Sequence, residues 1–265
     1  MARAAPISAP RAPWPWAFGG AALGVAAAAL LFAPARWLAG PLERATNGHL
    51  RLAEPRGTVW TGSAQLLVAG GAGSTDLMAL PTRVDWRLSP RWDGLLLQLE
   101  SGCCTSSAPL AVRMRPRWGG TRLAVADSNT QWPAALLAGL GTPWNTLQFE
   151  GDLALRTEGL SVEWVQGRLA ITGRAELTAQ RMSSRLSTLR PMGSYRITVL
   201  GGATPTLQLD TLEGSLQLAG SGQWVGSRLH FSGVASAAPD RESALANLLN
   251  IIGRRSGPRS IITIG

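Results

Sequence analysis

The sequence contains no lysine, since all 25 basic residues are arginine. Walker A phosphate binding, Schiff-base formation and Ser-x-x-Lys catalysis each need a lysine, so these three kinds of chemistry are excluded. Histidine is scarce too: His49 and His230 each lie without another histidine or a carboxylate at metal-ligand spacing. The chain also lacks the G-x-S-x-G and H-E-x-x-H motifs. We therefore predict a protein that is not an enzyme and that uses no metal or cofactor.

Cysteine is limited to Cys103 and Cys104, which are adjacent and cannot form an ordinary long-range bridge within one chain. A strained vicinal disulfide, a pair of small buried thiols and pairing between two chains all remain open. We expect structural thiols, buried or loosely exposed, and assign them no role.

Acidic residues offer one further candidate for catalysis. Glu150 and Asp152 share a face of a predicted strand from Leu147 to Leu155, as the carboxylates of a glycosidase do. Two charges on the polar face of an amphipathic strand are the simpler interpretation. His230 alternates with apolar neighbours, so we also expect it on the solvent side of a strand.

Arginine gives the chain a formal charge of +9. This excess is consistent with attraction to anionic lipid or an acidic partner, or simply with an arginine-rich, solvated surface, which we prefer. The arginines alternate along predicted strands and do not cluster, so nucleic acid is not an expected partner.

The longest uncharged run extends from Ala12 to Ala35. As a helix it would be about 36 Å long, enough for a hydrocarbon core of about 30 Å. Trp14, Trp16 and Trp37 bracket the run, as interface anchors do. We predict a cytoplasmic tail over residues 1–11, a transmembrane anchor over 12–37 and a β domain outside the cytoplasm over 38–265.

A cleaved signal peptide is the rival interpretation, because Ala33-Pro34-Ala35 has the small-x-small form of a cleavage site. The run is also rich in alanine and glycine, so its insertion is favourable by only about 2 to 4 kcal/mol. Gly20, Gly24 and Ala28 recur at every fourth residue and form a small-residue face for packing against another transmembrane helix. Chance spacing in an alanine-rich segment is the alternative.

Alternating polar and apolar residues dominate the rest of the chain. In the segment from Thr82 to Leu88 the alternation puts Val84, Trp86 and Leu88 on one face of a strand. The pattern recurs around residues 110–114, 147–155, 195–199, 207–209, 216–218 and 229–231. About a dozen short strands result, with glycine and proline at the turns of an antiparallel meander.

Four W-x-G motifs begin at Trp60, Trp92, Trp118 and Trp224, each before a predicted strand. We interpret each as a tight turn in which glycine permits a positive φ and tryptophan covers the hairpin end. Their irregular spacing suggests decayed duplication, with two similar halves over 38–132 and 144–265.

Two helices interrupt the strands. A short central helix is predicted over residues 133–140, beginning at a proline. An amphipathic helix begins near Asp240, which we expect to cap it, and ends before Gly253. Its apolar stripe consists of Leu245, Leu248, Leu249 and Ile252. The expected fold is mainly β: an N-terminal transmembrane helix, then a curved antiparallel sheet with these two helices, and a last strand over 260–264.

Four motifs in order extend over nearly the whole chain: G-T-V-W-T-G-S-A from Gly57, G-L-G-T-P-W-N-T-L from Gly139, S-R-L-S from Ser184 followed by P-M-G-S-Y-R, and L-L-N-I-I-G-R-R from Leu248. Together they resemble the type II secretion system protein N family, the N component of the general secretory pathway of Gram-negative bacteria. The resemblance implies a single-pass protein of the bacterial inner membrane. Its periplasmic β domain would be an accessory part of the machine that exports folded proteins across the outer membrane.

The resemblance implies partners in the inner-membrane platform and in periplasmic parts such as the secretin, and no catalytic residues. Two functions are compatible with it. The β domain is either a scaffold that docks partner subunits at strand edges or at the C-terminal helix, or a lipid-handling module with an apolar concave face, similar to AsmA-like or lipopolysaccharide-transport proteins.

Overall fold

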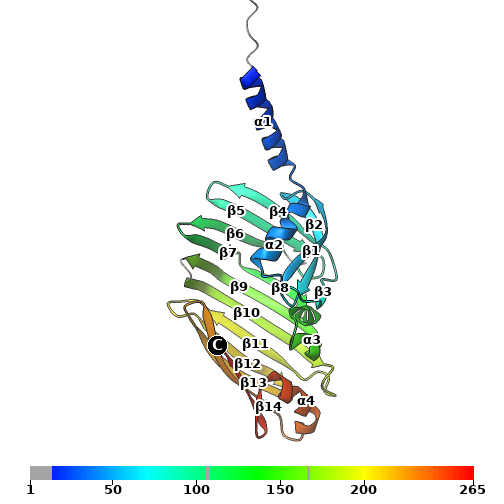
Figure 1. The fold of residues 1–265 in the computed structure, drawn as a ribbon. Coiled ribbons are helices and arrows are strands. Elements are labelled where there is room, and N and C mark those ends of the chain that lie inside the picture. Colours follow the sequence, from blue (N-terminus) through cyan, green and yellow to red (C-terminus); the bar gives the residue numbers. More distant parts are fainter. Residues whose placement is uncertain (1–13, 106–107, 166–167) are drawn as a thin grey trace, which may run out of the picture.

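The computed structural model describes residues 14–105, 108–165 and 168–265 of the chain. The body is one curved antiparallel sheet, and helix α1 (Trp14–Leu31) extends away from one end of it (Figure 1). The predicted mainly β class is therefore confirmed. The predicted cytoplasmic tail, residues 1–11, lies outside the described residues.

The strands follow one another across the sheet almost in chain order. They are β1 (Leu50–Gly57), β2 (Thr61–Ala69), β3 (Leu77–Ala79), β4 (Val84–Arg91), β5 (Gly94–Ser101), β6 (Leu110–Arg117), β7 (Gly120–Val125), β8 (Ser128–Pro133), β9 (Phe149–Val165), β10 (Arg168–Ser184), β11 (Gly193–Leu200), β12 (Thr206–Gly214), β13 (Leu216–Val225), β14 (Arg228–Ala237), β15 (Arg254–Ser256) and β16 (Arg259–Ile264). The main path runs from β1 at one edge to β15 at the other, with β3 paired to β2 and β8 to β9. Because β7 pairs with β9, the two predicted halves share this one sheet.

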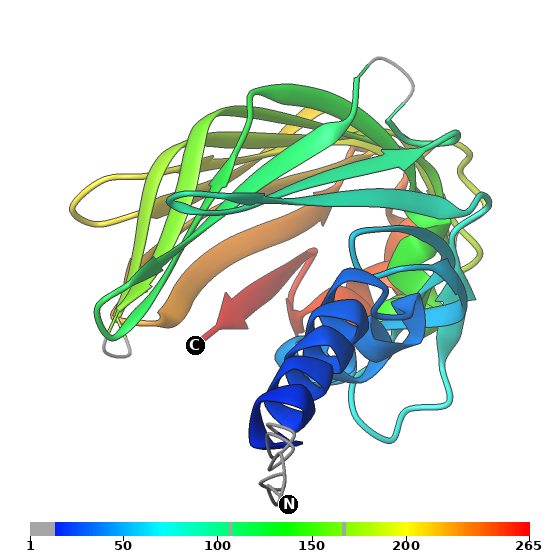
Figure 2. The ribbon, with the colours of Figure 1, turned by 90° about the horizontal axis from the view of Figure 1, so that it is seen from above.

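Strands β9 and β10 are the longest pair, with 17 residues each, or roughly 55 Å of extended chain. Their pairing shifts register at two places, between Thr172 and Arg174 and between Gln180 and Ser183. Gly173 lies in the first shift with φ +82° and faces the backbone of Gly159 so closely that a side chain would not fit. Such bulges bend strands, and Figure 2 shows the strong curvature of the sheet.

Helices cover the apolar face at one end of the strands. They are η1 (Ala35–Leu38), α2 (Ala39–Ala45), η2 (Ala134–Leu140), α3 (Trp144–Leu147) and α4 (Glu242–Ile252). In Figure 1, α3 and α4 lie at the right ends of the strands, and the β4–β5 and β6–β7 hairpin turns lie at the left ends. The helix predicted over residues 133–140 corresponds to η2, which is a 3-10 helix. Asp240 does not cap α4, because Asp240 adopts φ 62° and Arg241 takes the cap position.

Helix α4 supplies the centre of the largest buried cluster. Leu245, Leu248 and Leu249 are fully buried, as the apolar stripe predicts, and pack with residues of β9, β10, β11, β13 and β14. Each buried leucine stabilises the fold by about 1.5 to 3 kcal/mol. Two smaller clusters lie toward the N-terminal strands, one around Ala35, Ala64 and Trp86 and one around Leu80, Val84 and Cys104.

The N-terminal helix is shorter than the predicted anchor over residues 12–37. It ends at Leu31 because Pro34 disfavours a helical conformation at Ala33 and has no N–H to donate. Ala33 and Ala35 are buried in the body of the protein. Within residues 14–105, 108–165 and 168–265, no helix combines the length and the apolarity that crossing a membrane requires.

Candidate functional site

One face of the sheet carries apolar side chains that no helix covers. Cross-strand pairing aligns Leu95 with Met114, Met114 with Leu123, and Leu123 with Val162, so the four side chains form a row across β5, β6, β7 and β9. The neighbouring row contains Leu88, Val112 and Val125, and its fourth member, Leu97, packs against the cluster around Trp86. We call the other seven residues the open apolar face: Leu88, Leu95, Val112, Met114, Leu123, Val125 and Val162. They lie outside the three buried clusters; six are partly buried, and Leu123 is exposed.

The opposite face of the sheet is polar and rich in ion pairs. Glu176 accepts from Arg174 at 2.6 Å and forms an ion pair with Arg196 at 3.2 Å, and Arg156 pairs with Glu158 at 2.7 Å. These pairs are partly exposed, so each stabilises the fold by less than about 1 kcal/mol. They balance charge on the solvent side, where Arg156, Glu158, Arg174 and Glu176 line a polar surface hollow of about 190 Å³. Each carboxylate in this hollow is already paired with an arginine.

The predicted carboxylate pair is divided between two ion pairs of this kind. Asp152 accepts from Arg181 at 2.6 Å, and Glu150 lies 3.5 Å from Arg190. His230 is exposed on β14, as predicted, and the Nδ1 atom of His49 lies 3.0 Å from the carbonyl oxygen of Ala69. In the part of the chain that the structure describes, no three His, Cys, Asp or Glu side chains gather at a metal-binding distance.

The predicted positive φ is confirmed for the motif glycines Gly94 and Gly226 and is wrong for the other two. Gly62 lies within β2, and Gly120 begins β7 after a turn in which Gly119 has the positive φ. The prediction that tryptophan covers each hairpin end is wrong for two of the motifs. Trp92 is 97% exposed and Trp118 is 100% exposed. In a tight two-residue turn the tryptophan side chain points away from the strands, so no strand residue lies beneath the indole. The exposure of these indoles could not be predicted from the motif itself.

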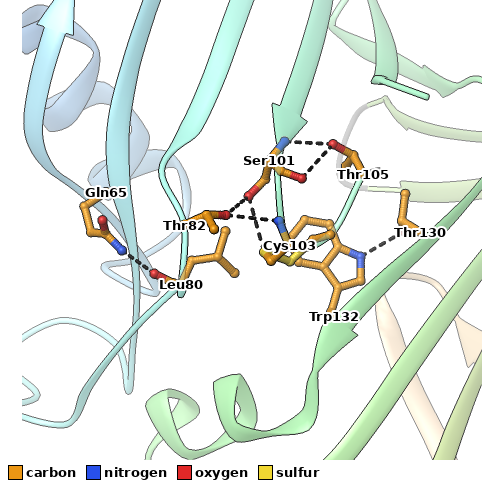
Figure 3. The surroundings of a disulfide bond; sticks show 9 residues. Gln65, Leu80, Thr82, Ser101, Cys103, Thr105, Thr130 and Trp132 are labelled. Carbon is orange, nitrogen blue, oxygen red and sulfur yellow. Dashed lines mark hydrogen bonds between the residues drawn. A yellow bond between two sulfur atoms is a disulfide. The ribbon is translucent and has the colours of Figure 1, made fainter. Parts of the chain in front are cut away.

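Cys103 and Cys104 form a vicinal disulfide with a Cα–Cα distance of 3.7 Å, which corrects the expected thiols (Figure 3). A tight turn after β5 brings the two sulfur atoms together. The Cys103 N–H donates to the Thr82 hydroxyl at 3.2 Å, and the Ser101 hydroxyl lies 3.3 Å from the Cys103 sulfur. Cys104 is 1% exposed and packs in the cluster with Leu80. The bridge therefore closes a local loop at the edge of a packed cluster.

The junction between α1 and the sheet is part of the folded body. The Val59 N–H donates to the carbonyl oxygen of Ala33 at 2.8 Å, and the Trp60 indole N–H donates to that of Leu30 at 2.8 Å. Pro34 forms a β-bridge with Thr58. Loss of residues up to Ala35 would thus remove native hydrogen bonds and buried side chains.

The remaining predicted site residues lie on or just after α1. Gly20 and Gly24 have open space around them, and Ala28 is exposed. Trp14, Trp16 and Trp37 are exposed too. Exposure alone does not test their packing and anchoring roles, which stay predictions.

Tyr195 is the chain's single tyrosine and lies in the largest buried cluster. Its hydroxyl group has no hydrogen-bond partner among the described residues. Burial raises the pKa of this hydroxyl well above its usual value of about 10. Sequence reasoning placed Tyr195 on the apolar face of a strand but gave no sign of the unpaired hydroxyl.

The fold and these surfaces define a β-sheet domain with an N-terminal helix, suited to contacts with other molecules through its faces, edges and turns. The family model described as "Type II secretion system (T2SS), protein N" matches residues 48–262, so the chain belongs to this family. Comparisons with curated proteins and with solved structures each found no match.

Family membership supports an accessory subunit of type II secretion, a generally non-enzymatic class that is associated with the cell envelope and interacts with other secretion components. The resemblance seen in the sequence motifs is thereby confirmed.

Proposed function

We propose that this protein is a membrane-tethered scaffold of the type II secretion system, with its β domain in the periplasm of a Gram-negative bacterium. The family match carries the proposal. The two outer strands of the sheet, β1 and β15, support it, because an outer strand presents unpaired backbone groups to which a partner strand can add. The occupants of these edges are then platform subunits or the secretin.

In-cell photo-crosslinking of the full chain tests the scaffold. A benzophenone amino acid at Arg255, which is exposed on β15, is expected to form adducts with secretion subunits, which mass spectrometry identifies. The matched control is the same amino acid at Gln223, which is exposed on β13 inside the sheet. Equal adducts at both positions, or none with any secretion subunit, would contradict docking at this edge.

Helix α1 is the proposed tether, with the N-terminus in the cytoplasm. Its apolar side chains, among them Phe18, Leu23 and Val25, are exposed, and the helix points away from the sheet (Figure 1). At 18 residues α1 is about 27 Å long, close to a hydrocarbon core of about 30 Å, and exposed Phe32 extends its apolar surface. The buried junction at Ala33 and Ala35 supports a retained tether, since cleavage there would remove part of the core.

The intact mass of protein extracted from membranes tests the tether. We expect a chain that retains α1, and a chain beginning at Arg36 would refute it. Gly24→Leu tests the proposed packing face, because a larger side chain blocks close approach of a second helix. It should weaken helix association in a membrane two-hybrid assay, and an unchanged signal would count against the packing face.

Lipid handling is a second candidate function, favoured by the partial exposure of the open apolar face. Val112 and Arg113 are neighbours on β6 that point to opposite faces of the sheet, so position 113 is a matched control for a crosslinker at position 112. A benzophenone amino acid at position 112, and not at 113, is expected to yield lipid adducts in cells. Protein adducts at position 112 would instead indicate that a partner subunit covers this face.

A further inference from the structure

Trp92 and Trp118 lie at the turns of two neighbouring hairpins, β4–β5 and β6–β7, which are joined by the pairing of β5 with β6. Both indoles are almost fully exposed, although an indole is among the side chains whose burial stabilises a protein most. Neither indole stabilises the fold by packing within it. Two such side chains on adjacent projecting turns indicate a surface that contacts something outside the chain.

The charge at these turns is positive. Arg91 and Arg117 come directly before the two tryptophans and are exposed. Asp93 pairs with Arg115, and Glu163 lies 3.8 Å from Arg117, so these two acids offset Arg115 and part of the charge of Arg117 and leave an excess of positive charge. In the described part of the chain Arg91 has no ion pair. Each turn therefore presents an indole beside a cationic side chain, which suits a negatively charged layer with an apolar interior.

The position of the turns favours the bilayer as the occupant. Figure 1 shows the β4–β5 hairpin among the strands nearest to α1, with the β6–β7 hairpin next to it and further from α1. Trp37, which follows α1, is also exposed. We propose that the β4–β5 and β6–β7 turns bind the headgroup region of an anionic lipid bilayer, with Trp92 and Trp118 inserted at the interface. This proposal rests on the tether described under the proposed function, which brings the domain to a membrane surface.

This contact would give the domain a second attachment to the membrane. A single helix leaves the domain free to rotate about the helix axis, whereas an added contact some distance away fixes its orientation. The attraction depends on arginine and anionic lipid, so it weakens at high salt and in neutral lipid.

Reconstitution of the full chain in liposomes tests the proposal. A benzophenone amino acid replaces Trp92, and lipid adducts are measured by mass spectrometry after irradiation. The matched control replaces Trp144, which is partly exposed on α3 at the opposite ends of the strands (Figure 1). We expect several-fold more lipid adduct at position 92 than at 144, and more in liposomes that contain phosphatidylglycerol than in phosphatidylcholine alone.

Charge reversal tests the role of arginine. Arg91→Glu combined with Arg117→Glu should lower the adduct at position 92 several-fold in phosphatidylglycerol liposomes and have little effect in neutral ones. The control variant, Arg87→Glu with Arg113→Glu, changes charge equally on exposed residues within β4 and β6. It should leave the adduct nearly unchanged, and an equal loss in both variants would overturn the proposal.

Flotation of the same liposomes shows whether the turns do not contact the bilayer or α1 does not insert into it. A chain that floats with neutral liposomes but gives equal adducts at positions 92 and 144 retains the tether and overturns the contact by the turns. Flotation only with anionic liposomes, lost in the Arg91 and Arg117 variant, would support the turns and contradict the tether. Adducts at position 92 in cells that contain protein and no lipid would also overturn the proposal.

Discussion

Tyr195 combines a buried ring with a hydroxyl group that has no hydrogen-bond partner among the described residues. Its pKa is raised by burial, so the folded state holds the proton more tightly than the unfolded state, whose hydroxyl titrates near pH 10. Stability should therefore be unaffected by this group below about pH 10 and should fall as pH rises above that value.

Tyr195→Phe removes both the titration and the unpaired hydroxyl. The variant is expected to be as stable as the parent, or more stable by about 1 kcal/mol, at neutral pH, and to lose less stability at alkaline pH. Because the chain has 1 tyrosine, tyrosinate absorbance reports this residue alone. A pKa near the usual value in the folded protein would contradict the prediction.

The vicinal disulfide leads to a different prediction. It links adjacent residues and so restricts the unfolded chain very little. The packing of Cys104 should therefore contribute more to the free energy of unfolding than the bridge does. Under reducing conditions Cys104→Ser should lower the free energy of unfolding by about 1 to 3 kcal/mol, because it buries a hydroxyl group in an apolar cluster. Cys103→Ser, at a more exposed position, should cost less than about 1 kcal/mol in the same urea titration. Equal losses would show that the two positions pack alike.

Side-chain environments were the hardest feature to predict. Period-two alternation correctly placed Val84, Trp86 and Tyr195 on the buried side of strands. The W-x-G motif could not distinguish a tryptophan within a strand, such as Trp224 in β13, from one at a turn, such as Trp92. The indole of Trp86 is buried because it lies within β4, whereas that of Trp92 projects beyond the end of the same strand.

Helix α4 holds its place through three leucines on one face. Leu248→Ala should lower the free energy of unfolding by about 2 to 5 kcal/mol, because it leaves a cavity in a fully buried position. Ile251→Ala removes an exposed side chain from the same helix and should cost less than about 1 kcal/mol. Chemical unfolding of the detergent-solubilised chain measures both, and similar losses would show that α4 is not packed as described.

Elements with a strong periodic pattern were predicted well. The amphipathic helix ends at Ile252, before Gly253, and the last strand ends at Ile264, both as expected. The lengths of β9 and β10 were not foreseen. Glycine is expected at turns, but Gly159 and Gly173 face each other within a bulge and the strands continue through them.

At the scale of the molecule, the link between α1 and the sheet determines how firmly the two are joined. Ala35 is 1% exposed beside Ala64 and Trp86, although the sequence placed it in the anchor. Ala35→Glu should lower the free energy of unfolding by roughly 3 kcal/mol or more, because it buries a charge without a partner. Trp37→Glu, at an exposed position, is the control and should have little effect on thermal unfolding. Equal stability of the two variants would show that the link is not part of the core.

The near-sequential order of the strands has a consequence for how the chain folds during synthesis or export. A hairpin such as β4–β5 or β6–β7 can pair with the strand before it as soon as it emerges, without waiting for residues far downstream. Nascent strands would then spend little time unpaired, which limits aggregation of a sheet with a large apolar face. The exception is the final segment, where β16 inserts between β14 and β15, so closure of this edge depends on the last residues to appear.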